Sequence, residues 1–170
     1  AGEVIERDIC IIGAGPAGMA CASTLGERGH RVTLIDRADE IGGQFNVAKR
    51  IPGKEEFHET LRYFGHQLRD TGVELRLREN ADVAMLRDGG YDEVVVATGV
   101  TPRQVDFPGS DDPRVLGYLD VLARDRPVGA RVAIIGAGGI GFDVAEFLVE
   151  RAPSPTTDGA RWTREWSVDI

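Results

Sequence analysis

Three glycines and one aspartate carry the clearest chemical signal in this 170-residue sequence. Gly13, Gly15 and Gly18 directly follow a run of four apolar residues. In this spacing the first glycine permits a tight turn, the second lets the backbone approach a diphosphate, and the third lets a helix pack closely on a strand. Asp36 ends a second apolar run, Val32–Ile35, 18 residues after Gly18. A carboxylate at that point accepts hydrogen bonds from ribose hydroxyls, so the pattern predicts a dinucleotide site.

A strand, a helix and a second strand must position these residues. The run Ile9–Ile12 predicts the first strand, and Val32–Asp36 predicts the second. The helix between them begins at the glycines, and its unpaired N–H groups and its dipole favour a phosphate. Pro16 and Ala17 lie between the second and third glycines and belong to the same predicted site. The alternative is a plain turn with an ordinary surface aspartate, but the order of strand, turn, helix, strand and acid favours the nucleotide site.

The pattern of apolar residues predicts an α/β fold with a central parallel sheet. A stripe of apolar residues at helical spacing predicts a core-facing helix over residues 54–70. The other predicted elements are strands over 73–78, 83–86 and 91–96 and a short helix over 115–124. The β-branched end of the strand over 91–96 is typical of strands buried in parallel sheets.

Two groups of small residues lie where a bound dinucleotide could be approached closely. Gly42 and Gly43 come just after the ribose-binding acid, and a plain loop turn explains them equally well. Ala97, Thr98 and Gly99 follow the strand over 91–96, where small residues let the backbone come near a ligand in the crevice. A simple strand-ending turn is the alternative.

The glycine motif returns late in the chain. Gly136, Gly138 and Gly141 follow the apolar run Val132–Ile135, which predicts a strand over 132–135, and a helix is expected over 142–151. A second dinucleotide site is the favoured interpretation. A turn that only packs a helix on a strand is the alternative, because no acid follows. No further apolar strand follows either, so we expect a truncated second unit in a piece of a longer polypeptide.

The prolines after residue 101 indicate a crossing segment between domains. We therefore expect a first nucleotide-binding domain over residues 1–108. Residues 109–170 are expected to hold the crossing segment and the start of the second domain.

Composition narrows the classes of partner and location. The net charge of −8 argues against a nucleic-acid surface. No apolar run approaches the roughly 20 residues that span a bilayer, so no membrane partner is expected. The first residues lack the positive and apolar segments of a secretory signal, so we expect a cytoplasmic location. Small-molecule nucleotides are the expected ligands.

No catalytic or metal-binding residue is expected from the residue types. Cys10 and Cys21 are the only cysteines, too few for a thiolate metal or iron–sulfur site. His58 and His66 lie off the apolar stripe of their helix and are expected to be solvated. A protein that positions cofactors needs no catalytic triad or carboxylate pair.

Longer strings of residues resemble a known family. Residues 39–46, 51–57, 97–103 and 134–145 resemble the carboxyl-terminal half of the bacterial NADPH-dependent 2,4-dienoyl-CoA reductases, with trimethylamine dehydrogenase as a more distant relative. The resemblance implies a Rossmann-like FAD/NAD(P)-binding three-layer fold. It implies electron transfer from NADPH to FAD. FMN and a four-iron four-sulfur cluster are implied only for the longer parent, and the rest of that polypeptide is an implied partner.

The resemblance also implies the cofactor contacts. Val83 is placed in a short strand beside the adenine. The other residues implied to contact FAD are Gly13, Gly15, Pro16, Ala17, Gly18, Asp36, Arg37, Gly43, Gln44, Ala97, Thr98 and Gly99. Those implied to contact NADPH are Gly136, Gly138, Gly139, Ile140 and Gly141. Two alternatives stay open: an adenine-nucleotide module without redox activity, since ADP fills the corresponding site of trimethylamine dehydrogenase, and a fragment that binds nothing well.

Overall fold

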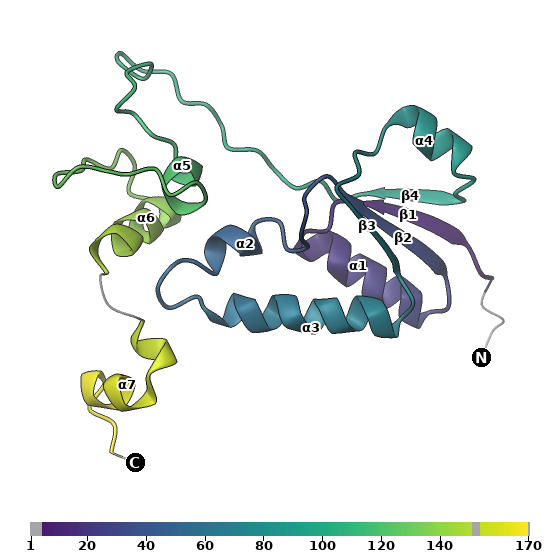
Figure 1. The fold of residues 1–170 in the computed structure, drawn as a ribbon, viewed down its shortest axis with the longest axis horizontal. Coiled ribbons are helices and arrows are strands. Elements are labelled where there is room, and N and C mark those ends of the chain that lie inside the picture. Colours follow the sequence, from purple (N-terminus) through teal and green to yellow (C-terminus); the bar gives the residue numbers. More distant parts are fainter. Residues whose placement is uncertain (1–4, 151–153, 170) are drawn as a thin grey trace. The chain divides into compact units, whose positions relative to one another are not determined.

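Residues 5–150 and 154–169 are described by the computed structural model shown in Figure 1. The chain forms two units. One runs to Asn46 and resumes from His58 to Thr101, and the other consists of Val47–Phe57 and the chain from Pro102 onward. A segment from the first half of the sequence therefore belongs to the second unit. The division into domains 1–108 and 109–170 stays a prediction.

A four-stranded parallel sheet forms the centre of the first unit. Its strands are β1 (Asp8–Ile12), β2 (Arg31–Asp36), β3 (Glu74–Leu77) and β4 (Glu93–Val96), in the order β3-β2-β1-β4. Ile11 in β1 is in register with residues 34 and 95 of its two neighbours. The apolar runs of β1 and β2 fit the central positions, because strands there are covered on both faces. The predicted α/β fold with a parallel sheet is confirmed.

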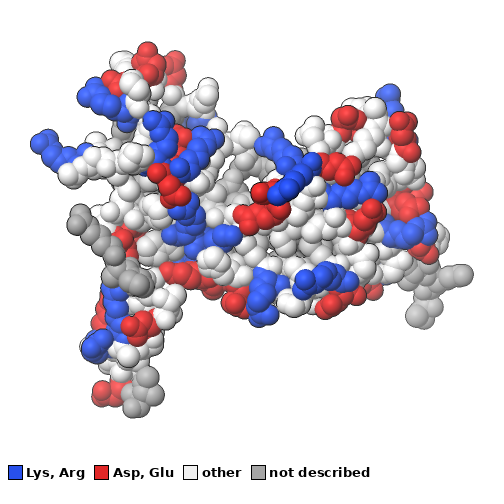
Figure 2. Space-filling model, in the orientation of Figure 1, with Lys and Arg blue, Asp and Glu red and all other residues white. Residues whose placement is uncertain are grey.

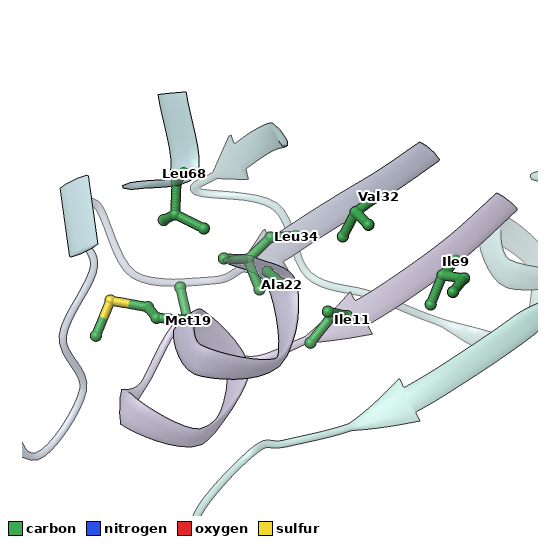
Figure 3. Close-up of a cluster of buried hydrophobic side chains, with 8 residues drawn as sticks. Ile9, Ile11, Met19, Ala22, Val32, Leu34 and Leu68 are labelled. Atoms are coloured by element: carbon green, nitrogen blue, oxygen red, sulfur yellow. The ribbon is translucent and has the colours of Figure 1, made fainter. Parts of the chain in front are cut away.

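Helix α1 (Pro16–Glu27) and the sheet enclose the core of this unit. Figure 3 shows Ile9, Ile11, Val32 and Leu34 pointing from β1 and β2 toward Met19 and Ala22 of α1. Ile11, Met19, Ala22 and Leu34 have no exposed surface. Alternate residues of a strand share one face, and here that face supplies the core.

Helix α3 (Glu56–Asp70) closes the same core, as its apolar stripe predicts. Leu68 is buried in the cluster, and Leu61 and Phe64 pack against it. The helix begins at Glu56, two residues later than predicted. Helices α1 and α3 lie on the same side of the sheet in Figure 1.

The predicted strand over 83–86 is wrong, because these residues begin helix α4 (Val83–Asp88). The Asp82 side chain accepts a hydrogen bond from the Met85 N–H at 2.8 Å, which caps the helix. An aspartate before a helical segment is a standard N-cap, and that signal outweighs the apolar residues that suggested a strand. Val83, 64% exposed, therefore lies in a helix and not in the expected short strand, and its contact with an adenine stays a prediction.

The second unit holds α5 (Tyr118–Leu122), α6 (Gly139–Val149), a 3-10 turn (Pro155–Thr157) and α7 (Gly159–Glu165), while α2 (Phe45–Ala48) leads from the first unit into it. Its core joins Ile51 to Val121, Leu122 and Val144. The Lys54 ammonium donates to an Asp143 carboxylate oxygen at 2.7 Å. These contacts explain why residues 47–57 belong to this unit.

The strand predicted over 132–135 is absent from the described residues. Ile135 is 78% exposed, and no described strand of the second unit pairs with this run. A strand is stabilised by hydrogen bonds to a neighbour, so an unpaired apolar run stays irregular. Helix α6 begins at Gly139, earlier than predicted, and ends at Val149, because Glu150 is extended. The predicted end at Arg151 lies outside the described residues.

Charged side chains of both signs are scattered over the visible surface (Figure 2). Figure 2 shows Lys and Arg interspersed with Asp and Glu. Many of them form ion pairs; for example, a guanidinium nitrogen of Arg7 lies 2.7 Å from a carboxylate oxygen of Glu93. Among the described helices, none combines the length and the apolar character needed to cross a bilayer.

Candidate functional site

The carboxyl ends of three parallel strands meet at one edge of the sheet. Strands β1, β2 and β4 end at Ile12, Asp36 and Val96. The chain leaves β1 through α1 toward β2, while β4 lies on the other side of β1. In open α/β sheets the crevice at such a switch in strand order is where ligands bind.

The glycine turn lies at this edge, and two of its glycines are required by packing. Gly13 has φ +108°, and a Cβ there would lie 2.4 Å from the Ala97 carbonyl oxygen. A Cβ on Gly18 would lie 1.8 Å from the Gly13 carbonyl oxygen. Backbone atoms cannot yield to such contacts, so both positions exclude larger residues.

Gly15 differs from the other two glycines. Its φ of −77° suits any residue, and a Cβ there would meet no protein atom within 4 Å. It is the N-cap of α1, with Pro16 in the first turn. The packing of this chain does not require a glycine at this position. A helix N-terminus after such a glycine turn is where a dinucleotide fold places the diphosphate, and no protein atom occupies the Cβ position of Gly15.

The Asp36 carboxylate points toward the glycine turn. One of its oxygens accepts a hydrogen bond from the Ala14 N–H at 2.6 Å, and the other accepts from the Ala38 N–H at 2.8 Å. The Glu79 N–H donates to the Asp36 carbonyl at 3.0 Å, which anchors the end of β2. An ionised carboxylate offers about four acceptor positions, so about two stay available for ribose hydroxyls.

Other predicted residues gather around the same turn. A Cβ on Gly43 would lie 3.1 Å from the Gly15 Cα, and the Ala97 N–H donates to the Ile12 carbonyl at 2.8 Å. Thr98 is close as well, since a Cβ on Gly13 would lie 3.1 Å from its Cα. Ala17 in the first turn of α1 is exposed, as are the loop residues Arg37, Gln44 and Gly99.

The second glycine turn reproduces the first locally. Gly136 has φ +113°, and a Cβ on Gly141 would lie 2.2 Å from the Gly136 carbonyl oxygen. Gly138 is the N-cap of α6, and a Cβ on Gly138 or Gly139 would meet no protein atom within 4 Å. Ile140 is 53% exposed. The backbone therefore repeats the local geometry of the first turn, although the strand that precedes such a turn is not formed.

Two residues of this arrangement, Ala14 and Ala38, were not predicted from the sequence, and Gly42 was predicted only as one of a glycine pair near the nucleotide. Ala14 and Ala38 act through backbone N–H groups, which no residue type reveals. The Gly42 N–H donates to the Ala14 carbonyl at 2.8 Å. The glycine doublet was the one available signal, and it did not distinguish a loop turn from a contact with the glycine motif.

The histidines and cysteines form no reactive centre among the described residues. The His66 ring nitrogen lies 3.0 Å from the Arg69 guanidinium on the same helix. Cys10 is buried and Cys21 is half-buried, and both are free thiols. Within the described ranges no group of three or more His, Cys, Asp or Glu could hold a metal ion.

Comparison with known proteins identifies the family. A family model described as pyridine nucleotide-disulphide oxidoreductase matches residues 7–154. The chain belongs to this family. Membership implies binding of a flavin and a nicotinamide nucleotide, and with it the Rossmann-like FAD/NAD(P)-binding fold.

The relatives of this chain include reductases and dehydrogenases. The chain is 34% identical to bilirubin reductase of Mediterraneibacter gnavus over 85% of its length and 23% of that protein. Cinnamate reductase of Clostridium sporogenes is also 34% identical, over 88% of this chain and 22% of that protein. A solved structure of 2-naphthoyl-CoA reductase in complex with 2-naphthoyl-CoA has a TM-score of 0.80 at 31% identity, covering 85% of this chain and 22% of that one.

These relatives confirm the resemblance to the family of 2,4-dienoyl-CoA reductase and trimethylamine dehydrogenase. They also show that the chain spans less than a quarter of the length of the three proteins compared.

Proposed function

We propose that this chain holds FAD at the first glycine turn and NADPH at the second, and passes electrons from NADPH to FAD within a longer flavoprotein. The proposal rests above all on the free space at Gly15, where neither packing nor backbone conformation calls for a glycine. A nucleotide diphosphate accounts for the glycine there.

The residues of the first turn bind and orient the nucleotide. The N–H groups at the start of α1 and the helix dipole face the diphosphate. The Asp36 carboxylate, held by two backbone N–H groups, accepts hydrogen bonds from the ribose. The flavin supplies the chemistry of accepting a hydride and releasing electrons singly or in pairs, and the protein supplies position.

The second turn is proposed to hold the NADPH diphosphate in the same way. The support is the local geometry of Gly136, Gly138 and Gly141 at the start of α6. The choice of NADPH over NADH rests on the family resemblance.

For the whole protein, we propose that electrons pass from FAD to further cofactors. The 2,4-dienoyl-CoA reductase resemblance supports FMN and a four-iron four-sulfur cluster elsewhere in a longer polypeptide. That polypeptide is the proposed partner of this chain, and a cytoplasmic location stays a prediction of the sequence.

A second candidate is an adenine-nucleotide module without redox activity of its own. The observation that favours it is the kind of group that the first site can bind. The residues gathered there suit a diphosphate and a ribose. ADP carries both groups, so it would fill this site as well as the corresponding half of FAD.

Identifying the nucleotide bound to the purified chain distinguishes the two candidate functions. The visible absorption spectrum of the chain is recorded, the protein is denatured, and the released nucleotide is identified by chromatography and mass spectrometry. Flavin absorbance and released FAD support the first candidate, while colourless protein that releases ADP supports the second. A chain that carries no nucleotide and binds neither FAD nor ADP at millimolar concentration contradicts both.

A further inference from the structure

Gly42 is absent from the nucleotide contacts that the family resemblance implies, yet its N–H donates to the Ala14 carbonyl of the glycine turn. We propose that Gly42 is a positioning residue for a nucleoside diphosphate at the first turn. It acts by fixing the peptide group that carries the Gly15 N–H. This inference rests on the proposed function of the turn.

Two successive peptide groups of the turn are held by partners outside it. The Ala14 N–H donates to the Asp36 carboxylate at 2.6 Å. The Ala14 carbonyl accepts from the Gly42 N–H at 2.8 Å. Ala14 has no exposed surface, so water does not compete for these groups.

The second of these hydrogen bonds sets the direction of a donor. The Ala14 carbonyl and the Gly15 N–H belong to the same planar trans peptide group, in which they point in opposite directions. Holding the carbonyl on Gly42 therefore turns the Gly15 N–H away from Gly42. A Cβ on Gly15 would meet no protein atom within 4 Å, and the proposal places a phosphate oxygen on this side of the residue as the acceptor of the Gly15 N–H.

Position 42 accepts only glycine. Its φ is +121°, and a Cβ there would lie 2.7 Å from Leu61 Cδ2 and 2.9 Å from Asn46 Nδ2. Asn46 braces the same loop, since its side-chain amide donates to the Ile41 carbonyl at 2.9 Å. A side chain at position 42 would strain the backbone, because φ is positive, and would push against the Leu61 and Asn46 side chains. We expect both effects to weaken the hydrogen bond to Ala14.

The test compares Gly42→Ala with Gly29→Ala in the full chain. Gly29 also has a positive φ, +85°, but a Cβ there meets nothing within 4 Å, and the residue lies beyond the far end of α1. The control therefore reproduces the backbone strain without touching the turn. ADP affinity is measured by titration calorimetry, and circular dichroism verifies that each variant is folded.

We expect Gly42→Ala to weaken ADP binding at least tenfold and Gly29→Ala to change it less than twofold. The second readout is the change in the NMR chemical shift of the Gly15 amide when ADP is added. The variants are compared at equal occupancy of the ADP site. That shift should fall to less than half its wild-type size in Gly42→Ala and stay unchanged in Gly29→Ala. A loss of stability alone would not change it.

A second variant covers the case in which Gly42→Ala does not fold. Asn46→Ala removes the brace without adding strain, and we expect about threefold weaker ADP binding. A folded Gly42→Ala with wild-type affinity and shift overturns the inference, as does unchanged affinity in Asn46→Ala when Gly42→Ala is unfolded. Wild-type protein that binds no ADP contradicts the proposed function instead, which keeps the two failures apart.

Discussion

Replacing Gly15 by alanine should separate nucleotide binding from folding. Gly15 has φ −77° and ψ −177°, which alanine adopts without strain, and the added methyl group meets no protein atom within 4 Å. Alanine lowers the entropy of the unfolded chain, worth about 0.4–1 kcal/mol, and is a poorer N-cap by a similar amount. The free energy of unfolding should therefore change by less than about 1 kcal/mol.

Binding should respond much more strongly than folding. The methyl group occupies the space that the diphosphate would take, so at least one hydrogen bond from the helix N-terminus to a charged oxygen is lost. Such a bond contributes about 1.5–3 kcal/mol. At about 1.4 kcal/mol for each factor of ten, ADP affinity should fall roughly 10- to 150-fold.

The assay combines urea unfolding with calorimetric titration of ADP, and Gly18→Ala is the matched control. A Cβ at position 18 would lie 1.8 Å from the Gly13 carbonyl oxygen, so this variant should lose more than about 2 kcal/mol of stability. Gly15→Ala that binds ADP within twofold of wild type would refute the assignment of the open space to a diphosphate. Gly15→Ala that unfolds like Gly18→Ala would refute the packing argument.

Three further predictions follow from single contacts. Asp36→Ala should weaken adenine-nucleotide binding by about 1–3 kcal/mol, because ribose hydroxyls lose their acceptor, and unchanged affinity in a titration removes Asp36 from the site. Burial raises the pKa of the Cys10 thiol, so iodoacetamide at pH 8 should label Cys21 first, as read by peptide mass spectrometry; faster labelling of Cys10 contradicts its burial. The Arg76 guanidinium, hydrogen-bonded at 2.9 Å, lowers the pKa of Glu74, so this pair stabilises the fold above the unfolded pKa of about 4.3 and the gain is lost as pH falls through the folded pKa. Arg76→Met should therefore lower the free energy of urea unfolding more at pH 7 than at pH 3, and equal losses at both pH values would argue against the pair.

The parts of the fold that were predicted correctly depend on neighbours in the sequence. The strands that became β1 and β2, the stripe of α3 and both glycine turns are local patterns of residue type and spacing. The strand expected at Val83 was wrong because Asp82, a single capping residue, changed the preference of a short segment. Short apolar runs are ambiguous between helix and strand, and a cap decides between them.

The sequence by itself determined the order of elements around the first turn, the candidate carboxylate Asp36 and the family of flavin-dependent oxidoreductases. Only the tertiary structure decided that residues 47–57 pack with α6, that Val132–Ile135 forms no strand, and that Gly42 holds the Ala14 carbonyl. The physical reason is the range of the interactions. Turns, caps and helical stripes are set by residues a few positions apart. Strand pairing and the packing of distant segments depend on partners far away in the sequence, which local patterns of residues do not identify.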